Sequence, residues 1–131
     1  MHELAVCQEL LRQVSEVADR RGATRVLRIT VRMGPLSGVE PGLLKRAFTI
    51  ARAGGIADRA RLDIETEPVR IRCGICGEES ETAPNRLRCP DCRSGPVSLV
   101  SGDALVLARV AMERPGAADG HAIDGEEARY V

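Results

Sequence analysis

The sequence predicts a small α+β (α/β) domain with two helices on a three-stranded sheet, and a four-cysteine unit inserted before the last strand. Three observations lead to this prediction. Two segments have the apolar spacing of amphipathic helices, three have the apolar pattern of strands, and two Cys-x-x-Cys pairs stand before the last strand. Since 131 residues make about one ordinary domain, a second unit in this chain must be small.

The first helix is predicted over residues 3–21, ELAVCQELLRQVSEVADRR. Apolar residues recur there at helical spacing, charged residues lie opposite them, and Gly22 follows as a stop signal. Cys7 falls within the apolar stripe, so we interpret it as a small buried apolar residue. Residues 25–33, RVLRITVRM, alternate apolar and polar side chains and are predicted to form a half-exposed strand.

The second helix is predicted from residue 41 to about residue 53. Glu40 precedes a proline at the first helical position, and two glycines follow the apolar face as a stop signal. Residues 61–73, RLDIETEPVRIRC, are predicted to form a strand that leads to the cysteines. Residues 102–112, GDALVLARVAM, are apolar at nearly every position, which favours a central strand covered on both faces.

These elements divide the chain into three parts. Residues 1–68 and 102–112 are expected to form one discontinuous α/β domain, and residues 69–101 a zinc-ribbon insert. The tail, residues 113–131, is rich in Gly, Ala and acidic residues without periodicity, so we expect it to be disordered.

The insert has the form C-x2-C-x12-C-x2-C, with Cys73, Cys76, Cys89 and Cys92 as candidate ligands. Two such pairs can aim four thiolates at one point, the arrangement that Zn²⁺ prefers in structural sites. An iron–sulfur cluster and a redox dithiol pair remain as alternatives. Because the insert has few apolar residues, we expect it to fold only when the metal is bound. A closed four-cysteine site has no open position for a substrate.

Composition argues against several classes of protein. The 19 basic and 19 acidic residues balance, and only one Phe and one Tyr are present, which opposes nucleic-acid binding. No run of 18 apolar residues and no signal peptide is found, so we expect a cytoplasmic protein without membrane contact. No set of nucleophile, base and oxyanion donors is recognisable, so an enzyme is not expected.

One alternative function stays open at this point. A zinc ribbon can serve as an interaction module for protein or nucleic acid, and this insert has a locally basic flank. The arginines of that flank are Arg70, Arg72, Arg86, Arg88 and Arg93.

One of the two histidines stands at position 2. Because His is bulky, we expect Met1 to be retained with a free amine. That amine, the backbone and ring nitrogens of His2 and the backbone nitrogen of Glu3 are close enough in the chain to form fused chelate rings around one metal ion. A tetragonal or square-planar nitrogen set suits Ni(II) or Cu(II).

Four stretches together resemble one family. MHE at the amino terminus, GPLSGVEP after the first strand, the CGIC and CPDC pairs, and the closing GDALVL strand are similar to those of the hydrogenase maturation nickel metallochaperones, the HypA family. The resemblance covers residues 1–112. In contrast to some relatives, this chain has no His beside the paired cysteines.

The resemblance implies a protein that passes Ni(II) to the large-subunit precursor of a [NiFe] hydrogenase together with a maturation GTPase, and in some members to urease maturation factors. It implies that His2 is the nickel ligand and that the four cysteines of the insert hold structural Zn²⁺. Met1, Glu3 and Glu40 would form an auxiliary part of the nickel site, Glu3 through a backbone nitrogen or an outer carboxylate. No catalytic residues are implied.

Overall fold

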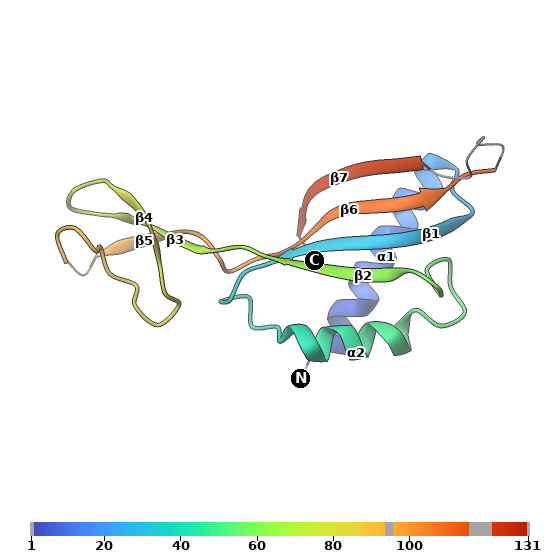
Figure 1. The fold of residues 1–131 in the computed structure, drawn as a ribbon, viewed down its shortest axis with the longest axis horizontal. Coiled ribbons are helices and arrows are strands. Elements are labelled where there is room, and N and C mark those ends of the chain that lie inside the picture. The colour runs from blue at the N-terminus through green and yellow to red at the C-terminus, as the bar shows by residue number, and fades with distance from the viewer. Residues whose placement is uncertain (1, 94–95, 116–121, 131) are drawn as a thin grey trace. The chain divides into compact units, whose positions relative to one another are not determined.

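The structure, a computed structural model, describes residues 2–93, 96–115 and 122–130. In chain order its elements are α1 (Glu3–Arg21), β1 (Arg25–Met33), α2 (Pro41–Ala51), β2 (Arg61–Thr66), β3 (Val69–Cys73), β4 (Glu79–Thr82), β5 (Val97–Ser101), β6 (Leu105–Glu113) and β7 (Ala122–Tyr130) (Figure 1). The strands form a four-stranded sheet in the order β2-β1-β6-β7 and a three-stranded sheet in the order β4-β3-β5. The described part therefore has the expected α+β class.

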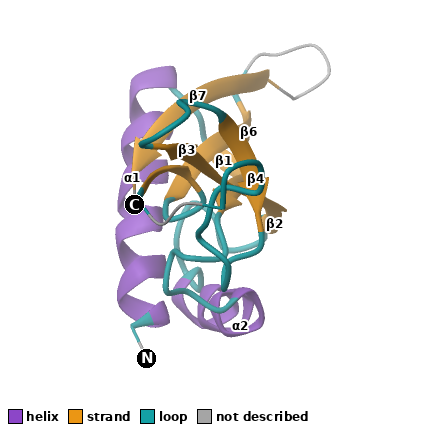
Figure 2. Cartoon of the chain, turned by 90° about the vertical axis from the view of Figure 1, so that its left-hand side faces the viewer, coloured by secondary structure: helices purple, strands orange, loops and turns teal. Residues whose placement is uncertain are grey.

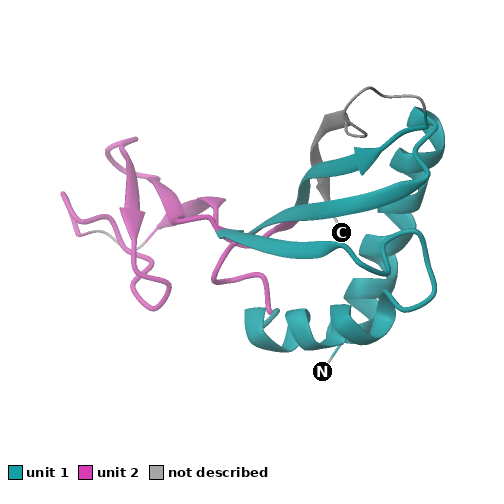
Figure 3. Ribbon diagram, turned by 45° about the vertical axis from the view of Figure 1, so that its right-hand side comes forward, with its two compact units in different colours: residues 1–32, 39–65, 106–131 teal, residues 33–38, 66–105 magenta. Residues whose placement is uncertain are grey.

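The chain divides into two compact units (Figure 3). Unit 1 comprises residues 1–32, 39–65 and 106–131, and unit 2 comprises residues 33–38 and 66–105. The second unit therefore includes a short segment that lies well before the cysteines in the sequence, which the pattern of apolar residues did not indicate.

In unit 1, α1 lies along one face of the four-stranded sheet and α2 packs against α1 (Figures 1 and 2). Most of the predicted apolar stripe of α1 is buried, but Leu4, in the first turn, keeps 46% of its surface exposed. Gly22 ends the helix in the left-handed conformation with φ 67°. Leu44 and Phe48 are the buried residues of α2. Burial of each large apolar side chain contributes about 1.5–3 kcal/mol, so this interface supplies much of the stability of the unit.

The open face of the same sheet carries charged side chains. Arg28 of β1 pairs with Asp63 of β2 at 3.2 Å, and Arg109 of β6 reaches Glu65 of β2 at 2.7 Å. These residues are partly exposed, so each pair contributes at most about 1 kcal/mol. They keep this face of the sheet in contact with water and the apolar face toward the helices.

Two strand predictions need correction, and two strands were not predicted. Residues 61–73 form two strands in different sheets, β2 and β3, because Pro68 has no N–H and disfavours a regular strand at this point. The last strand, β6, begins at Leu105 and is central, as expected, but it is not covered on both faces, because Arg109 is exposed on the charged face of the sheet. The insert also contains β4 and β5, which pair with β3 on either side; their polar or short sequences carried no strand pattern.

The tail is not disordered throughout. Ala122–Tyr130 form β7, which pairs antiparallel with β6 and gives the sheet a fourth strand in place of the expected three. Backbone pairing to an open strand edge requires no apolar periodicity, which explains why the sequence pattern missed it. The tail's histidine, His121, lies outside the described residues.

No helix in the described part of the chain is long and apolar enough to cross a membrane.

A close backbone contact in unit 2 fixes the segment at residues 33–38. The N–H of Gly34 donates to the carbonyl of Ala104 at 3.0 Å, and the N–H of Leu36 donates to the carbonyl of Gly102 at 2.8 Å. A Cβ atom at Gly34 would lie 2.1 Å from the Gly102 carbonyl oxygen. Only glycine fits at position 34, because the atoms that a Cβ would meet all belong to the backbone of Gly102 and cannot rotate away.

We therefore expect Gly34→Ala to destabilise unit 2 by about 1–3 kcal/mol, because the backbone must shift to admit the methyl group. Amide hydrogen exchange at Leu36 measures this as faster opening. Gly55→Ala is the control, because its Cβ would meet only the Arg52 carbonyl oxygen at 3.7 Å. Equal exchange rates in the two variants would contradict the close contact.

Candidate metal centres

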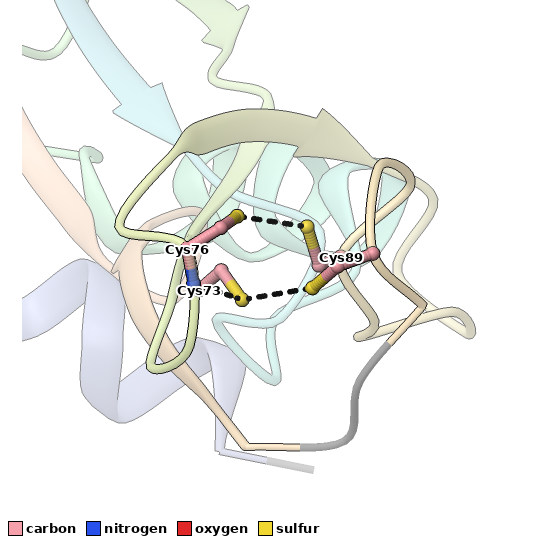
Figure 4. Close-up of side chains that lie close together, drawn as sticks. Cys73, Cys76 and Cys89 are labelled. Atoms are coloured by element: carbon pink, nitrogen blue, oxygen red, sulfur yellow. Dashed lines mark hydrogen bonds between the residues drawn. The ribbon is translucent and has the colours of Figure 1, made fainter.

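Four cysteines of unit 2 meet at one point (Figure 4). Cys73 ends β3, Cys76 lies in the following turn, and Cys89 and Cys92 lie in the loop between β4 and β5. The Sγ atoms of Cys73 and Cys92 are 3.4 Å apart, those of Cys76 and Cys89 are 3.7 Å apart, and no two of the four exceed 4.8 Å. The cluster predicted from the sequence is therefore present in the structure.

Each Cys-x-x-Cys pair is held by a tight backbone turn. The N–H of Gly77 donates to the carbonyl of Cys73 at 3.1 Å, and the N–H of Arg93 donates to the carbonyl of Cys89 at 2.9 Å. In the first turn the N–H groups of Ile75 and Cys76 also point at the Cys73 sulfur, at 3.3 and 3.4 Å. N–H groups directed at a sulfur stabilise its thiolate form, which is the form that binds metals.

The four thiols oppose one another's ionisation when no cation is present. The backbone N–H of Glu78 lowers the pKa of the Cys76 thiol, but desolvation and hydrogen bonds with the other three thiols outweigh it and raise this pKa to about 12. Only a cation at the centre would make four adjacent thiolates favourable at neutral pH.

The geometry fits a single tetrahedral ion. With metal–sulfur bonds of about 2.3 Å, the sulfur–sulfur edge of a tetrahedron is about 3.8 Å, close to the separations between these sulfurs. Cys73 and Cys89 are buried, and Cys76 and Cys92 are exposed. The cluster therefore lies near the surface of unit 2, and it offers one sulfur for each of the four positions of a tetrahedral ion.

The fifth cysteine has no part in this cluster. Cys7 is fully buried in unit 1, where its Sγ atom donates to the carbonyl of Leu44 at 3.5 Å. Burial, and secondarily the charge of Glu3, raise the pKa of its thiol to about 11. This confirms the interpretation of Cys7 as a small buried residue.

The candidate nickel residues lie where the two helices of unit 1 begin. His2 is exposed and occupies the N-cap position of α1, but its side chain makes no capping hydrogen bond. Its backbone carbonyl accepts from the N–H of Val6 at 2.9 Å, which fixes the backbone of His2 to the first turn of the helix. Met1 lies outside the described residues.

Glu3 joins the starts of α1 and α2. A hydrogen bond from the amino terminus lowers the pKa of the Glu3 carboxyl below its usual value, and the backbone N–H groups of Glu3 and Glu40 lower it further. The side chain is buried, with 8% of its surface exposed. Glu3 thus connects the start of α1 with the residue that precedes α2.

Glu40 has a role that the sequence showed only in part. Its carboxylate accepts from the N–H of Gly42 at 3.0 Å and from the N–H of Leu43 at 2.8 Å, so it is the N-cap of α2. An acidic residue directly before a proline at the first helical position is the sequence signal for this cap. The bond from its backbone N–H to the Glu3 carboxylate carried no sequence signal, because it joins segments 37 residues apart.

Comparison with known proteins identifies close relatives of this chain. A family described as "Hydrogenase/urease nickel incorporation, metallochaperone, hypA" matches residues 1–112. The hydrogenase maturation factor HypA of Nitrosospira multiformis is 42% identical over 110 residues, which are 84% of this chain and 96% of that protein. The HypA of Aquifex aeolicus is 37% identical over 113 residues, 86% of this chain and 98% of that protein.

A solved structure of the same family has a similar fold. The solution structure of the Ni metallochaperone HypA from Helicobacter pylori superposes with a TM-score of 0.68 at 28% identity, and the match covers 87% of this chain and 99% of that one.

We predict that Glu40→Ala lowers the unfolding free energy of unit 1 by about 1 kcal/mol, because two N–H groups of α2 lose their acceptor. Asp is itself a favourable N-cap residue, so Glu40→Asp should retain most of the stability. Thermal unfolding followed by far-UV circular dichroism measures both variants. Equal melting temperatures for Glu40→Ala and Glu40→Asp would mean that the cap contributes nothing.

We predict that Cys76→Ser loses most of the metal bound by the four-cysteine cluster, together with the ordered structure of unit 2, while unit 1 stays folded. Elemental analysis measures the metal, and dispersed amide resonances report the fold of each unit. Cys7→Ala is the control and should keep the metal, since Cys7 is buried elsewhere. Full metal content in Cys76→Ser would exclude this cysteine as a ligand.

Proposed function

The chain belongs to the HypA family of nickel metallochaperones for hydrogenase and urease, and we propose that it binds Ni(II) at its amino terminus and delivers it for [NiFe] hydrogenase maturation. The observation that carries the proposal is the position of His2, exposed directly before α1 with an imidazole that the helix cap does not use. The second metal centre is confined to unit 2. Cargo and structural metal therefore have separate ligands.

Nickel is the cargo, and we assign its ligands around His2. The amine of Met1, the backbone and ring nitrogens of His2 and the backbone nitrogen of Glu3 supply a nitrogen set of the kind that suits Ni(II). The first N–H groups of a helix have no partner within the helix, so their protons can be lost without breaking a helical hydrogen bond. Glu3 and Glu40 then act from outside the ligand set, Glu3 by its carboxylate and Glu40 by fixing the start of α2 and the carboxylate of Glu3.

The four cysteines of unit 2 would hold Zn²⁺, which supplies folding energy and no reaction chemistry. Zn²⁺ is favoured over an iron–sulfur cluster because four sulfurs this close together can all reach one ion. It is favoured over a redox dithiol because two Cys-x-x-Cys turns face each other and the set of four is complete. The thiolates fill every position of a tetrahedral ion, so nickel exchange is not assigned to this centre.

The partners we propose follow from this delivery role. They are a maturation GTPase and the large-subunit precursor of a [NiFe] hydrogenase, and urease maturation factors where urease is also served. We place these encounters in the cytoplasm. We assign the chain no catalytic activity, because nickel transfer needs ligands that can be dismantled and no bond-making residues.

We predict that His2→Ala protein keeps its zinc and loses nickel. The nickel affinity should fall by more than the ~10–100-fold that loss of an outer-shell partner of a metal costs. His121→Ala removes the other histidine of the chain and is the control. Calorimetric titration with Ni(II) on untagged protein and elemental analysis for zinc measure the two effects.

An uncleaved amino-terminal tag should have the same effect as His2→Ala, because it removes the free amine. Nickel binding to the unmodified chain should weaken as the pH falls, since the ligand nitrogens must lose their protons. Nickel uptake by the tagged protein or by His2→Ala equal to that of the unmodified chain would refute the terminal site.

A further inference from the structure

The loop between β4 and β5 surrounds a hollow of about 800 Å³ in unit 2. Arg86, Arg88 and Arg93 line it, with Leu87 between the first two and Glu81 at the end of β4. Backbone turns hold the loop, because the N–H of Arg86 donates to the carbonyl of Ala83 at 3.0 Å. The hollow is therefore built by one ordered segment and lies beside Cys89.

The three arginines that line this hollow form no ion pair within the described part of the chain. Arg70 and Arg72, on β3, both pair with Glu79. By contrast, the three arginines of the hollow are exposed and form no ion pair among the described residues.

Two uncharged groups of the hollow are also without a partner. Leu87 keeps 44% of its surface exposed. The Oγ1 atom of Thr82 is buried and has no hydrogen-bond partner among the residues that the structure describes. An exposed apolar side chain and an unused hydroxyl beside free guanidinium groups are the elements of a site for a ligand with both acidic and apolar groups.

The backbone at Arg93 is the strongest indication that its side chain is needed. In the two Cys-x-x-Cys turns, Gly77 and Arg93 occupy equivalent positions, and each donates its N–H to the carbonyl of the first cysteine. Both residues have positive φ, 77° for Gly77 and 56° for Arg93. In the part of the chain that the structure describes, Arg93 is the one residue other than glycine with positive φ. A left-handed backbone costs a non-glycine residue about 1–2 kcal/mol, so glycine would be the more stable residue here. Arginine at this position points to a function of the guanidinium group.

We propose that this hollow is a docking site for an acidic segment of a protein partner, with carboxylates on Arg86, Arg88 and Arg93 and an apolar side chain against Leu87. A bidentate guanidinium–carboxylate pair is the contact that three arginines at one site provide best. The proposal concerns unit 2 alone and does not depend on nickel binding at His2.

Nucleic acid fits this surface less well. Unit 2 has five arginines against six acidic residues, so it offers no extended positive field for a phosphate backbone. Glu81 also lines the hollow and would repel a phosphate chain. A short peptide can place its carboxylates on the three arginines and leave Glu81 to water.

The test uses the full, zinc-loaded chain labelled with ¹⁵N and three probes. The first probe is the peptide Glu-Glu-Leu-Glu-Glu with blocked ends, the second is Gln-Gln-Leu-Gln-Gln, and the third is an eight-nucleotide single strand of deoxythymidine. We expect the acidic peptide to shift the amide resonances of residues 81–93 saturably, and the other two probes to bind at least about fivefold more weakly. Equal binding of the glutamine peptide, tighter binding of the DNA, or shifts confined to residues outside 81–93 would overturn the proposal.

Variants locate the contact. Arg93→Gly should weaken binding of the acidic peptide about two- to fivefold, the range for loss of one exposed ion pair, while zinc content and thermal stability stay the same or rise. Arg86→Gln should weaken it similarly through a residue whose backbone is not strained. Arg70→Gln removes an equal charge outside the hollow and is the control. If Arg70→Gln weakens binding as much as the other two, the contact is only general charge attraction and the docking site is wrong.

Discussion

The meeting of four cysteine sulfurs within 4.8 Å is the constraint on which unit 2 depends. This unit has few large buried apolar side chains besides Val69 and Ile71, its strands have five residues or fewer, and β5 has no buried residue. Conformational entropy opposes folding by about 1–2 kcal/mol for each residue that is ordered, which so small a core cannot offset alone. The proposed metal–thiolate bonds would supply stability on this scale. Such bonds would position β3, the two cysteine turns and the loop that carries the free arginines.

Unit 1 is stabilised in the opposite way, by apolar contacts among α1, α2 and the sheet. Two carboxylates fix the starts of its helices. The Glu40 carboxylate caps α2, and the Glu3 carboxylate accepts the backbone N–H of Glu40. The residues around His2 are therefore attached to an ordered scaffold, while the imidazole itself stays exposed. Such an arrangement suits a ligand set that must take up an ion and later release it. A closed set of four thiolates suits retention.

The parts of the fold that were predicted from the sequence are those determined locally. Gly22 is a local signal for the end of α1, and Glu40 is a local signal for the start of α2, and each helix ends or begins directly beside that residue. The cysteine cluster was recognisable because metal coordination imposes a fixed spacing. The strands β4, β5 and β7 could not be predicted, since their backbones pair with a partner strand and their side chains carry no periodic pattern. The Glu3–Glu40 contact escaped prediction for the same reason, because it depends on how two distant segments pack.

The path of the chain between the two units has one more consequence. Unit 2 takes residues 33–38 from one part of the sequence and residues 66–105 from another, and Gly34 is paired with Ala104. A fragment cut to the cysteine-bearing stretch alone would leave the carbonyls of Gly102 and Ala104 without their partners. The cysteine-bearing unit therefore cannot be excised as one continuous segment, because its backbone hydrogen bonds join two separate parts of the sequence.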